Sequence, residues 1–364
     1  MSNYSGCSVA AWPGTLPPSQ SHKLAVLPGT THGTFIDHAD VLLPMITLFL
    51  DRPYRKSRNR CGDAIRGKVI SLRSWIDSLK LWKTRVVCEG TNLKNVVSND
   101  GTLIAYDQIG KGPAIILVDG AFGSRVFGPM PHLAPFLAKD FTVFLYDRRG
   151  RNKSGDTPPY AVEREIEDIE ALISEAGGSA FVYGISSGAA LALEAAAVGI
   201  NIRKLALYEP PFVTANGNHK PQGDAVRQLS TMIAAGRRGD AVDYFMTKLM
   251  GMPSEAIVPM KQAPFWPLME AVAHTLVYDV IIMGDWSVPA KRLASVTVPT
   301  LVMNGELTDS KVRYAARAVA DALPHAQYRI LKSQTHDVAP DALAPVLKTF
   351  FMGPMPGEQG GLGI

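Results

Sequence analysis

The segment Gly184–Gly188, with the sequence Gly-Ile-Ser-Ser-Gly, constrains the fold of this chain more than any other feature. An apolar run rich in β-branched and aromatic residues precedes it at 179–183 and predicts a buried strand. An Ala- and Leu-rich run follows at 189–197 and predicts a helix. Glycines on both sides of Ser186 allow a sharp turn and a close approach of helix to strand. A serine held in such a turn exposes its hydroxyl, so we interpret Ser186 as a candidate nucleophile rather than part of an ordinary Gly/Ser turn.

The composition is typical of a globular protein, with 364 residues, 46% of them hydrophobic and 19% charged. The three cysteines are scattered and odd in number, so they predict neither a disulfide framework nor a metal site, and they favour a reducing compartment. The first residues lack a basic segment followed by an apolar one, and the apolar run at 41–50 is too short to span a bilayer. We therefore expect a cytoplasmic protein with no membrane partner.

The formal net charge of +4 comes from one segment of the chain. Between Arg52 and Lys94, 12 Lys and Arg residues stand against 3 Asp and Glu residues, so the remainder of the chain is acidic. Such a segment could bind nucleic acid or an anionic membrane, but a solvated linker without a partner is the simpler interpretation. Residues 52–91 are therefore predicted to be a basic linker, and no nucleic-acid partner is expected.

From about residue 92 onward, short apolar runs alternate with amphipathic stretches, which is typical of an α/β fold with a mostly parallel sheet. The dipeptide Asp100-Gly101 predicts the turn of an N-terminal hairpin. The predicted core comprises residues 92–211 and 290–352. Its later strands are predicted at 113–118, 141–146, 179–183, 204–208, 298–303 and 328–331, with helices at 163–176 and 340–351.

The alternation stops between residues 212 and 289. This stretch is rich in large apolar residues and in helix-forming runs broken by Gly, Pro and Asn. It predicts a helical lid over the strand ends, most of whose apolar side chains form its own core while a few face an apolar substrate pocket. The Gly-rich segment 353–364 is expected to be disordered.

A serine hydroxyl needs a base and an orienting carboxylate before it becomes a good nucleophile. His336, in a turn-rich loop after the last predicted strand, is the best candidate base. Asp309, which follows the strand at 298–303, gives the chain order Ser, Asp, His. Glu209, at the end of the strand at 204–208, could also reach the imidazole. The sequence favours Asp309 slightly and leaves both carboxylates open.

An acyl-transfer site also needs backbone donors for the developing oxyanion. The N–H of Ser187, directly after the candidate nucleophile, is one candidate donor. The N–H of Ala121, in the glycine-containing loop after the strand at 113–118, is the other.

On these features, residues from about 95 to 352 resemble the alpha/beta hydrolase fold-1 family, a group of bacterial cytosolic serine hydrolases. The resemblance implies an α/β-hydrolase fold with an inserted helical lid, Ser186 as nucleophile and His336 as base. The segments that carry it are Asp119–Ala121, Asp147–Gly155, Gly184–Gly188, Tyr208–Pro211, Asn304–Glu306 and Thr335–Asp337.

Two departures from the family pattern matter. Asp119-Gly120 stands where the family has His-Gly, and Thr308 stands where its acid loop has aspartate. The second departure keeps Glu209 open, because relatives such as haloalkane dehalogenases carry their acid after the earlier strand. Dehalogenase and epoxide hydrolase activities are not expected, since those enzymes use an aspartate where this chain has Ser186.

The N-terminal segment 1–51 contains a partial copy of the C-terminal pattern. Residues 27–32 resemble residues 331–336, and Lys23 to Asp51 as a whole resembles the tail of a second α/β-hydrolase, with His32 at its base position. Chance similarity is the alternative. We expect this segment to be a fusion remnant or the product of an over-long translation start, so that a chain beginning near Asn92 remains active.

Together these features predict a serine hydrolase that cleaves a small ester or related acyl substrate through an acyl-enzyme, with no cofactor and no metal. One alternative is a ligand-binding protein of the same fold with an inactive site. Another is an amidase, peptidase or carbon–carbon bond hydrolase that uses the same three residues. The natural substrate and the oligomeric state are not predicted.

Overall fold

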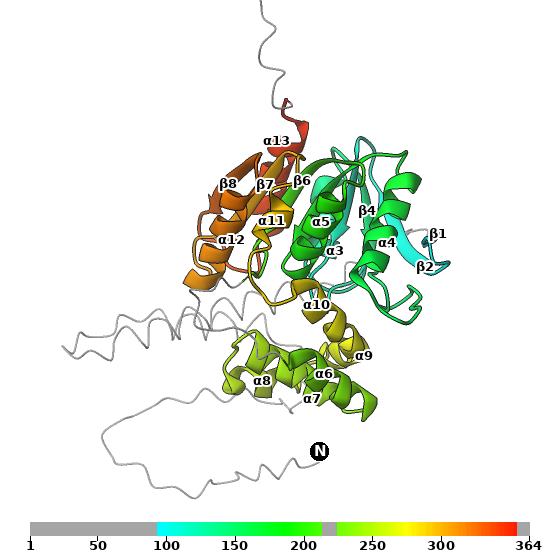
Figure 1. The fold of residues 1–364 in the computed structure, drawn as a ribbon, viewed down its shortest axis with the longest axis vertical. Coiled ribbons are helices and arrows are strands. Elements are labelled where there is room, and N and C mark those ends of the chain that lie inside the picture. The colour runs from blue at the N-terminus through cyan, green and yellow to red at the C-terminus, as the bar shows by residue number, and fades with distance from the viewer. Residues whose placement is uncertain (1–92, 213–223, 355–364) are drawn as a thin grey trace, which may run out of the picture. The chain divides into compact units, whose positions relative to one another are not determined.

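An eight-stranded sheet with the order β1-β2-β4-β3-β5-β6-β7-β8 organises the protein (Figure 1). The computed structural model describes residues 93–212 and 224–354. The predicted segment 1–51, the predicted linker 52–91 and most of the predicted C-terminal tail therefore lie outside the described residues. The strands are β1 (Lys94–Val97), β2 (Leu103–Ile109), β3 (Ala114–Val118), β4 (Thr142–Tyr146), β5 (Ala180–Ile185), β6 (Ile202–Tyr208), β7 (Thr300–Gly305) and β8 (Ala326–Leu331).

The sheet is mostly parallel, as predicted. Strand β2 pairs antiparallel with β1 and with β4, and every other pair in the sheet is parallel. The predicted hairpin is confirmed: Gly101 has φ +83°, and the N–H of Thr102 donates to the Asp100 carboxylate over 3.0 Å. The parallel strands all end at one edge of the sheet, which we call the carboxyl edge, and begin at the opposite amino edge.

Helices cover both faces of the sheet, because successive strand residues point to opposite sides. On one face, Ile116 and Val118 of β3 pack in a core with α4 (Val162–Glu175), α5 (Ser187–Val198) and α12 (Ser310–Ala322). On the other face, Ile115 and Leu117 pack with α3 (Met130–Leu137) and α13 (Pro340–Met352). This alternation explains why the central strands appear in the sequence as continuous apolar runs.

The segment between β6 and β7 is helical where it is described, as predicted. In Figure 1 its helices α6–α9 lie beyond one end of the sheet. Its role as a lid stays a prediction. Its elements are α6 (Ala225–Ala234), α7 (Arg238–Tyr244), η1 (Phe245–Leu249), α8 (Ser254–Met260), α9 (Trp266–Ala271), η2 (Ala273–Thr275) and α10 (Leu276–Met283), and the short α11 (Ala290–Leu293) leads back to β7.

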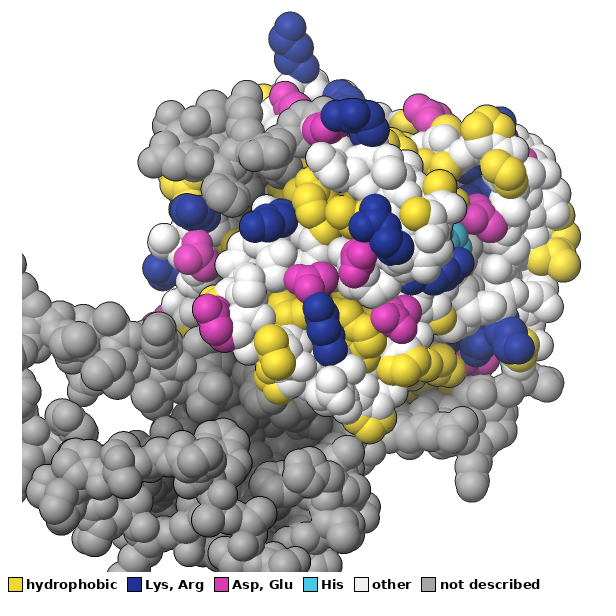
Figure 2. Space-filling view, turned by 90° about the horizontal axis from the view of Figure 1, so that it is seen from below, with side chains coloured by type: hydrophobic (Ala, Val, Ile, Leu, Met, Phe, Trp, Pro, Cys, Tyr) yellow, Lys and Arg dark blue, Asp and Glu magenta, His cyan; other side chains and the backbone are white. Residues whose placement is uncertain are grey.

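The surface seen from below in Figure 2 mixes apolar side chains with charged side chains of both signs. On the helical segment between β6 and β7, Met250, Val258 and Leu268 are among the exposed large apolar residues. Within the described ranges, no helix combines the length and the apolar character needed to cross a membrane.

Candidate active site

Ser186 lies in a strained turn between β5 and α5. Its φ of 54° and ψ of −128° are rare for a residue with a side chain. Its N–H donates to the carbonyl of Tyr208 over 2.9 Å, so the β5–β6 ladder continues through the turn and fixes it. The sequence forms this turn because β5 is fully buried and α5, made largely of Ala and Leu, starts directly after the serine.

Close packing explains one glycine of the turn and one glycine of the loop beside it. A Cβ on Gly188 would lie 2.3 Å from the carbonyl oxygen of Val118, so only glycine lets α5 approach the end of β3. A Cβ on Gly120 would lie 3.1 Å from the Cβ of Ser186. The loop after β3 therefore packs directly against the serine.

His336, in the loop after β8, contacts a carboxylate on a neighbouring strand end. Its Nδ1 lies 2.6 Å from Oε2 of Glu209. The histidine side chain is 44% exposed, whereas the Glu209 side chain is fully buried. Because a carboxylate accepts hydrogen bonds, Nδ1 carries the proton in this contact and Nε2 is left with a free lone pair in the neutral ring.

Glu209 is held from several sides. It follows β6 with a φ of 50°, and its N–H donates to the carbonyl of Met303 over 2.9 Å. Its Oε1 accepts the N–H of Gly305 over 2.8 Å and the hydroxyl of Thr308 over 2.6 Å. The carboxylate is thus locked in one orientation, with Oε2 directed at the imidazole.

Asp309 does not take this position, so the slight preference for it is corrected. Its carboxylate accepts the N–H of Lys311 over 2.8 Å and caps α12, and the residue is exposed. The physical reason is the neighbouring Thr308, which occupies the place where the family has its aspartate and donates to Glu209 instead. Asp309, one residue later, is the N-cap residue of α12.

The protonation of His336 depends on Glu209. The partial burial of the ring by itself lowers the pKa of the imidazole, but the hydrogen bond and the negative charge of Glu209 outweigh it, so the pKa of His336 lies above its usual value. The ring is therefore more basic than a free histidine and better able to accept a proton.

One candidate oxyanion donor lies at the start of α5 and the other in the loop that packs against Ser186. Ser187 is the first residue of α5, where helical N–H groups have no partner within the helix. Ala121 lies in the turn after β3, and its N–H donates to none of the backbone carbonyls of the described loops and turns.

Three buried charged residues beside this site were not predicted from the sequence: Arg148, Arg151 and Asp279. A signal was present, because Asp279 is the one acidic residue within the apolar helix Leu276–Met283. A lone acid in an apolar helix, together with arginines in a loop at a strand end, is typical of a buried ion pair.

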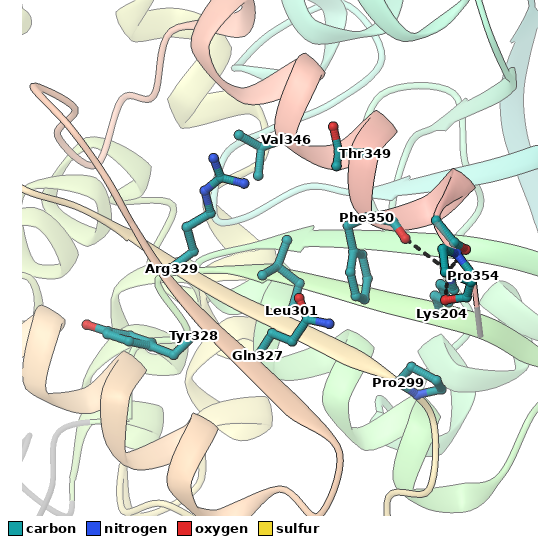
Figure 3. Close-up of a pocket in the computed structure, with 11 residues that line it drawn as sticks. Lys204, Pro299, Leu301, Gln327, Tyr328, Arg329, Val346, Thr349, Phe350 and Pro354 are labelled. Atoms are coloured by element: carbon teal, nitrogen blue, oxygen red, sulfur yellow. Dashed lines mark hydrogen bonds between the residues drawn. The ribbon is translucent and has the colours of Figure 1, made fainter. Parts of the chain in front are cut away.

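A separate hollow lies at the amino edge, near the starts of β6, β7 and β8 (Figure 3). Lys204, of which only 3% is exposed, donates there to the carbonyls of Phe350 and Gly353 over 3.0 and 2.6 Å. The ammonium thereby satisfies carbonyls at the C-terminal end of α13. We interpret the Lys204 contacts as structural.

Comparison with known proteins supports the fold described above. A model described as "Alpha/beta hydrolase family" matches residues 115–347. The crystal structure of an alpha/beta hydrolase from Sphaerobacter thermophilus DSM 20745 is similar, with 52% identity and a TM-score of 0.68, over 71% of this chain and 100% of that one. The uncharacterized hydrolase YraK of Bacillus subtilis (strain 168) is 37% identical over 106 residues, which are 26% of this chain and 38% of YraK.

More distant structures share the fold. A thermophilic esterase from Thermogutta terrifontis is 18% identical with a TM-score of 0.55, and the match covers 72% of this chain and 98% of the esterase.

Proposed function

This chain belongs to the alpha/beta hydrolase family and is an enzyme of the hydrolase class, and from that premise we propose that it is a serine hydrolase acting on a small ester or related acyl compound. The observation that carries the proposal is the contact between His336 and Glu209 at the carboxyl edge of the sheet, where the strained Ser186 also lies. Open α/β sheets bind their ligands at this edge.

In the proposed reaction, Oγ of Ser186 attacks the substrate carbonyl while Nε2 of His336 accepts the hydroxyl proton. Glu209 stabilises the imidazolium that forms. The N–H groups of Ala121 and Ser187 hold the tetrahedral oxyanion, and one such donor is worth about 100- to 1,000-fold in rate. The imidazolium then protonates the leaving group, which departs and leaves an acyl-enzyme.

Deacylation uses the same groups. His336 removes a proton from water, the resulting hydroxide attacks the acyl carbonyl, and the proton returns to Ser186 as the acid product leaves. In each of these steps, residues of this chain supply the nucleophile, the base and the hydrogen-bond donors.

An apolar acyl group suits the surroundings of the proposed oxyanion loop. Phe122 follows Ala121 directly, and its ring meets that of Phe245 edge to face with centroids 5.6 Å apart. Phe245 belongs to the helical segment between β6 and β7. This contact packs the segment against the loop that carries Ala121, and the proposal is that apolar side chains of this region receive the acyl group.

The test combines a fluorophosphonate probe with hydrolysis of p-nitrophenyl butyrate, using Ser186→Ala and the control Ser174→Ala. Ser174 lies on the exposed side of α4, where its hydroxyl donates to the carbonyl of Glu170. We expect rapid labelling of the wild-type protein and of the control, no labelling of Ser186→Ala, and a rate about 10⁴- to 10⁶-fold lower in that variant.

A wild-type protein that binds acyl compounds but is neither labelled nor turns them over would instead support the ligand-binding alternative. Full activity of Ser186→Ala would overturn the assignment of the nucleophile.

A further inference from the structure

A buried charge cluster lies beneath the loop that carries Ala121. Arg148, Arg151 and Asp279 each have side chains that are at most 1% exposed. Arg148 also forms two hydrogen bonds of 2.8 Å with Glu165. Burying such a cluster is unfavourable, because each ion loses its hydration. We therefore ask which groups of the protein the charged side chains contact.

The two arginines bind the carbonyl groups of this loop. Nη1 of Arg151 donates to the carbonyl oxygens of Gly120 and Gly123 over 2.5 and 3.0 Å. Nη1 of Arg148 donates to the carbonyl oxygen of Asp119 over 3.2 Å. Three of the carbonyls around Ala121 are thereby fixed by positive charge.

The bond to Gly120 has a direct consequence for Ala121. The carbonyl of Gly120 and the N–H of Ala121 belong to one planar peptide unit and point in opposite directions. A guanidinium that holds the carbonyl on one side therefore aims the N–H to the other side. It also polarises the peptide, which makes the N–H a stronger donor.

Asp279 joins both sides of the proposed oxyanion hole. Its Oδ1 accepts the hydroxyl of Ser187 over 2.7 Å and Nη1 of Arg148 over 2.8 Å, while its Oδ2 accepts Nη2 of Arg151 over 3.0 Å. Ser187 carries one proposed donor, and Arg151 orients the peptide that carries the other. The Asp279 carboxylate on α10 thus contacts Ser187, which carries one donor, and Arg151, which orients the peptide of the other.

We infer that Asp279 is a positioning residue that fixes both backbone donors of the oxyanion hole, acting through Arg151 on Ala121 and through its own hydrogen bond on Ser187. This inference rests on the proposed function. It also links the helical segment between β6 and β7 to catalysis, because α10 is part of that segment.

A second buried ion pair provides the matched control. Asp168 on α4 makes two hydrogen bonds to Arg149, over 3.0 and 2.7 Å, and both side chains are at most 1% exposed. Arg149 also donates to Ser98, Asp100 and Thr102 at the β1–β2 hairpin and to the carbonyl of Arg164 on α4. This pair resembles the Asp279 pair in burial and chemistry, but its contacts lead away from the loop that carries Ala121.

The experiment compares Asp279→Asn, Ser187→Ala and Asp168→Asn with the wild-type protein. It measures kcat and KM for p-nitrophenyl butyrate, the rate of fluorophosphonate labelling, and the inhibition constant of a trifluoromethyl ketone, whose serine adduct bears an oxyanion. Thermal unfolding of each variant reports the structural contribution.

We expect Asp279→Asn to lower kcat and the labelling rate about 10- to 100-fold and to weaken ketone binding by a similar factor, with KM nearly unchanged. Ser187→Ala should lower them about 3- to 10-fold, because it loses one of the cluster's contacts to the site. Asp168→Asn should lower the melting temperature while kcat and ketone binding stay within about 3-fold of the wild type, since its contacts lie elsewhere.

Wild-type labelling separates the two hypotheses. If the wild-type protein is not labelled, the proposed function fails. If it is labelled and Asp279→Asn matches it in labelling and ketone binding, the positioning role is overturned while the proposed function stands. If Asp279→Asn does not fold, Ser187→Ala decides, because wild-type ketone affinity in that variant would equally overturn the inference.

Discussion

Loops at both edges of the sheet contain residues with positive φ angles, but the residue types differ between the two edges. Loops that enter β3, β5 and β6 at the amino edge need positive φ angles, and glycines supply them: Gly112, Gly178 and Gly199 have φ of 131°, 90° and 88°. At the carboxyl edge the first residues with positive φ after these strands carry side chains: Phe122, Ser186 and Glu209, with φ of 65°, 54° and 50°.

The difference shows where the molecule retains strain. Glycine adopts positive φ almost freely, whereas a residue with a side chain pays about 1–3 kcal/mol for it. Ser186 is the proposed nucleophile, Glu209 is the proposed acid, and Phe122 is the neighbour of a proposed oxyanion donor. These three side chains are therefore kept despite their effect on stability, while the three glycines at the amino edge are the residues that stabilise their loops best.

The largest expected effect tests the most constrained residue of the carboxyl edge. Glu209→Gln keeps the shape of the side chain but removes the charge that stabilises the imidazolium. We expect kcat to fall about 10³- to 10⁴-fold. Glu209 raises the pKa of His336, and activity requires the neutral ring, so the acidic limb of the remaining activity should move to lower pH.

The pH dependence of kcat/KM, measured for the wild type and for this variant, checks both statements. A limb that stays in place would show that another group controls the protonation of His336.

The next prediction concerns Asp119, a buried acid at the carboxyl edge whose Oδ2 has no partner among the described residues. Burial raises its pKa to about 7, against the opposing influence of Arg151. The folded protein then holds a proton that the unfolded chain releases near pH 4, so stability should fall as pH rises from about 4 to 7 and level off above.

Urea unfolding of the wild type and of Asp119→Asn at pH 5 and pH 8 measures this effect. The wild type should lose about 3 kcal/mol more than the variant between the two pH values. Equal losses of unfolding free energy in the two proteins would show that Asp119 does not cause the pH dependence.

Two glycine exchanges test the comparison of the edges directly. Ser186→Gly should be about 1 kcal/mol more stable than Ser186→Ala, because it relieves the positive φ. Gly178→Ala should be about 1–2 kcal/mol less stable than the wild type for the opposite reason. A Cβ at Gly178 would meet no atom within 4 Å, so the loss would come from the backbone alone.

Denaturant unfolding of the three variants decides the matter. If Ser186→Gly were not more stable than Ser186→Ala, or if Gly178→Ala were not less stable than the wild type, the proposed difference in backbone strain between the two edges would be contradicted.

The smallest effect is expected at Asp309, which lies at the carboxyl edge but does not contact His336. Asp309→Ala should remove the cap of α12 and lower stability by about 1 kcal/mol. Its kcat should stay within about 2-fold of the wild type. A loss of activity as large as that of Glu209→Gln would return Asp309 to the list of candidate acids.

The fold could be predicted from the sequence, because the alternating apolar runs reflect the local periodicity of strands and helices. The predicted strands at 113–118 and 141–146 differ from β3 and β4 by a single residue at their starts. The same local signals identified the turn around Ser186 and the loop that holds His336.

The choice between Glu209 and Asp309 could not be made in this way. The direction of Glu209 depends on its unusual φ and on donors from Gly305 and Thr308, which come from a different strand end. Likewise, Asp279 lies 92 residues from Ser187, and only the folded chain brings the two together. Side-chain contacts of this kind are set by tertiary packing and leave no periodic trace in the sequence.

The contact between Glu209 and His336 also determines when a growing chain can become active. The two residues are 127 positions apart, and the helical segment between β6 and β7, strand β7, helix α12 and strand β8 lie between them. A ribosome therefore completes the serine turn and the acid long before it adds the histidine. In refolding experiments, recovery of activity will accordingly follow the docking of β8, later than the fluorescence or circular dichroism changes that report collapse of the earlier strands.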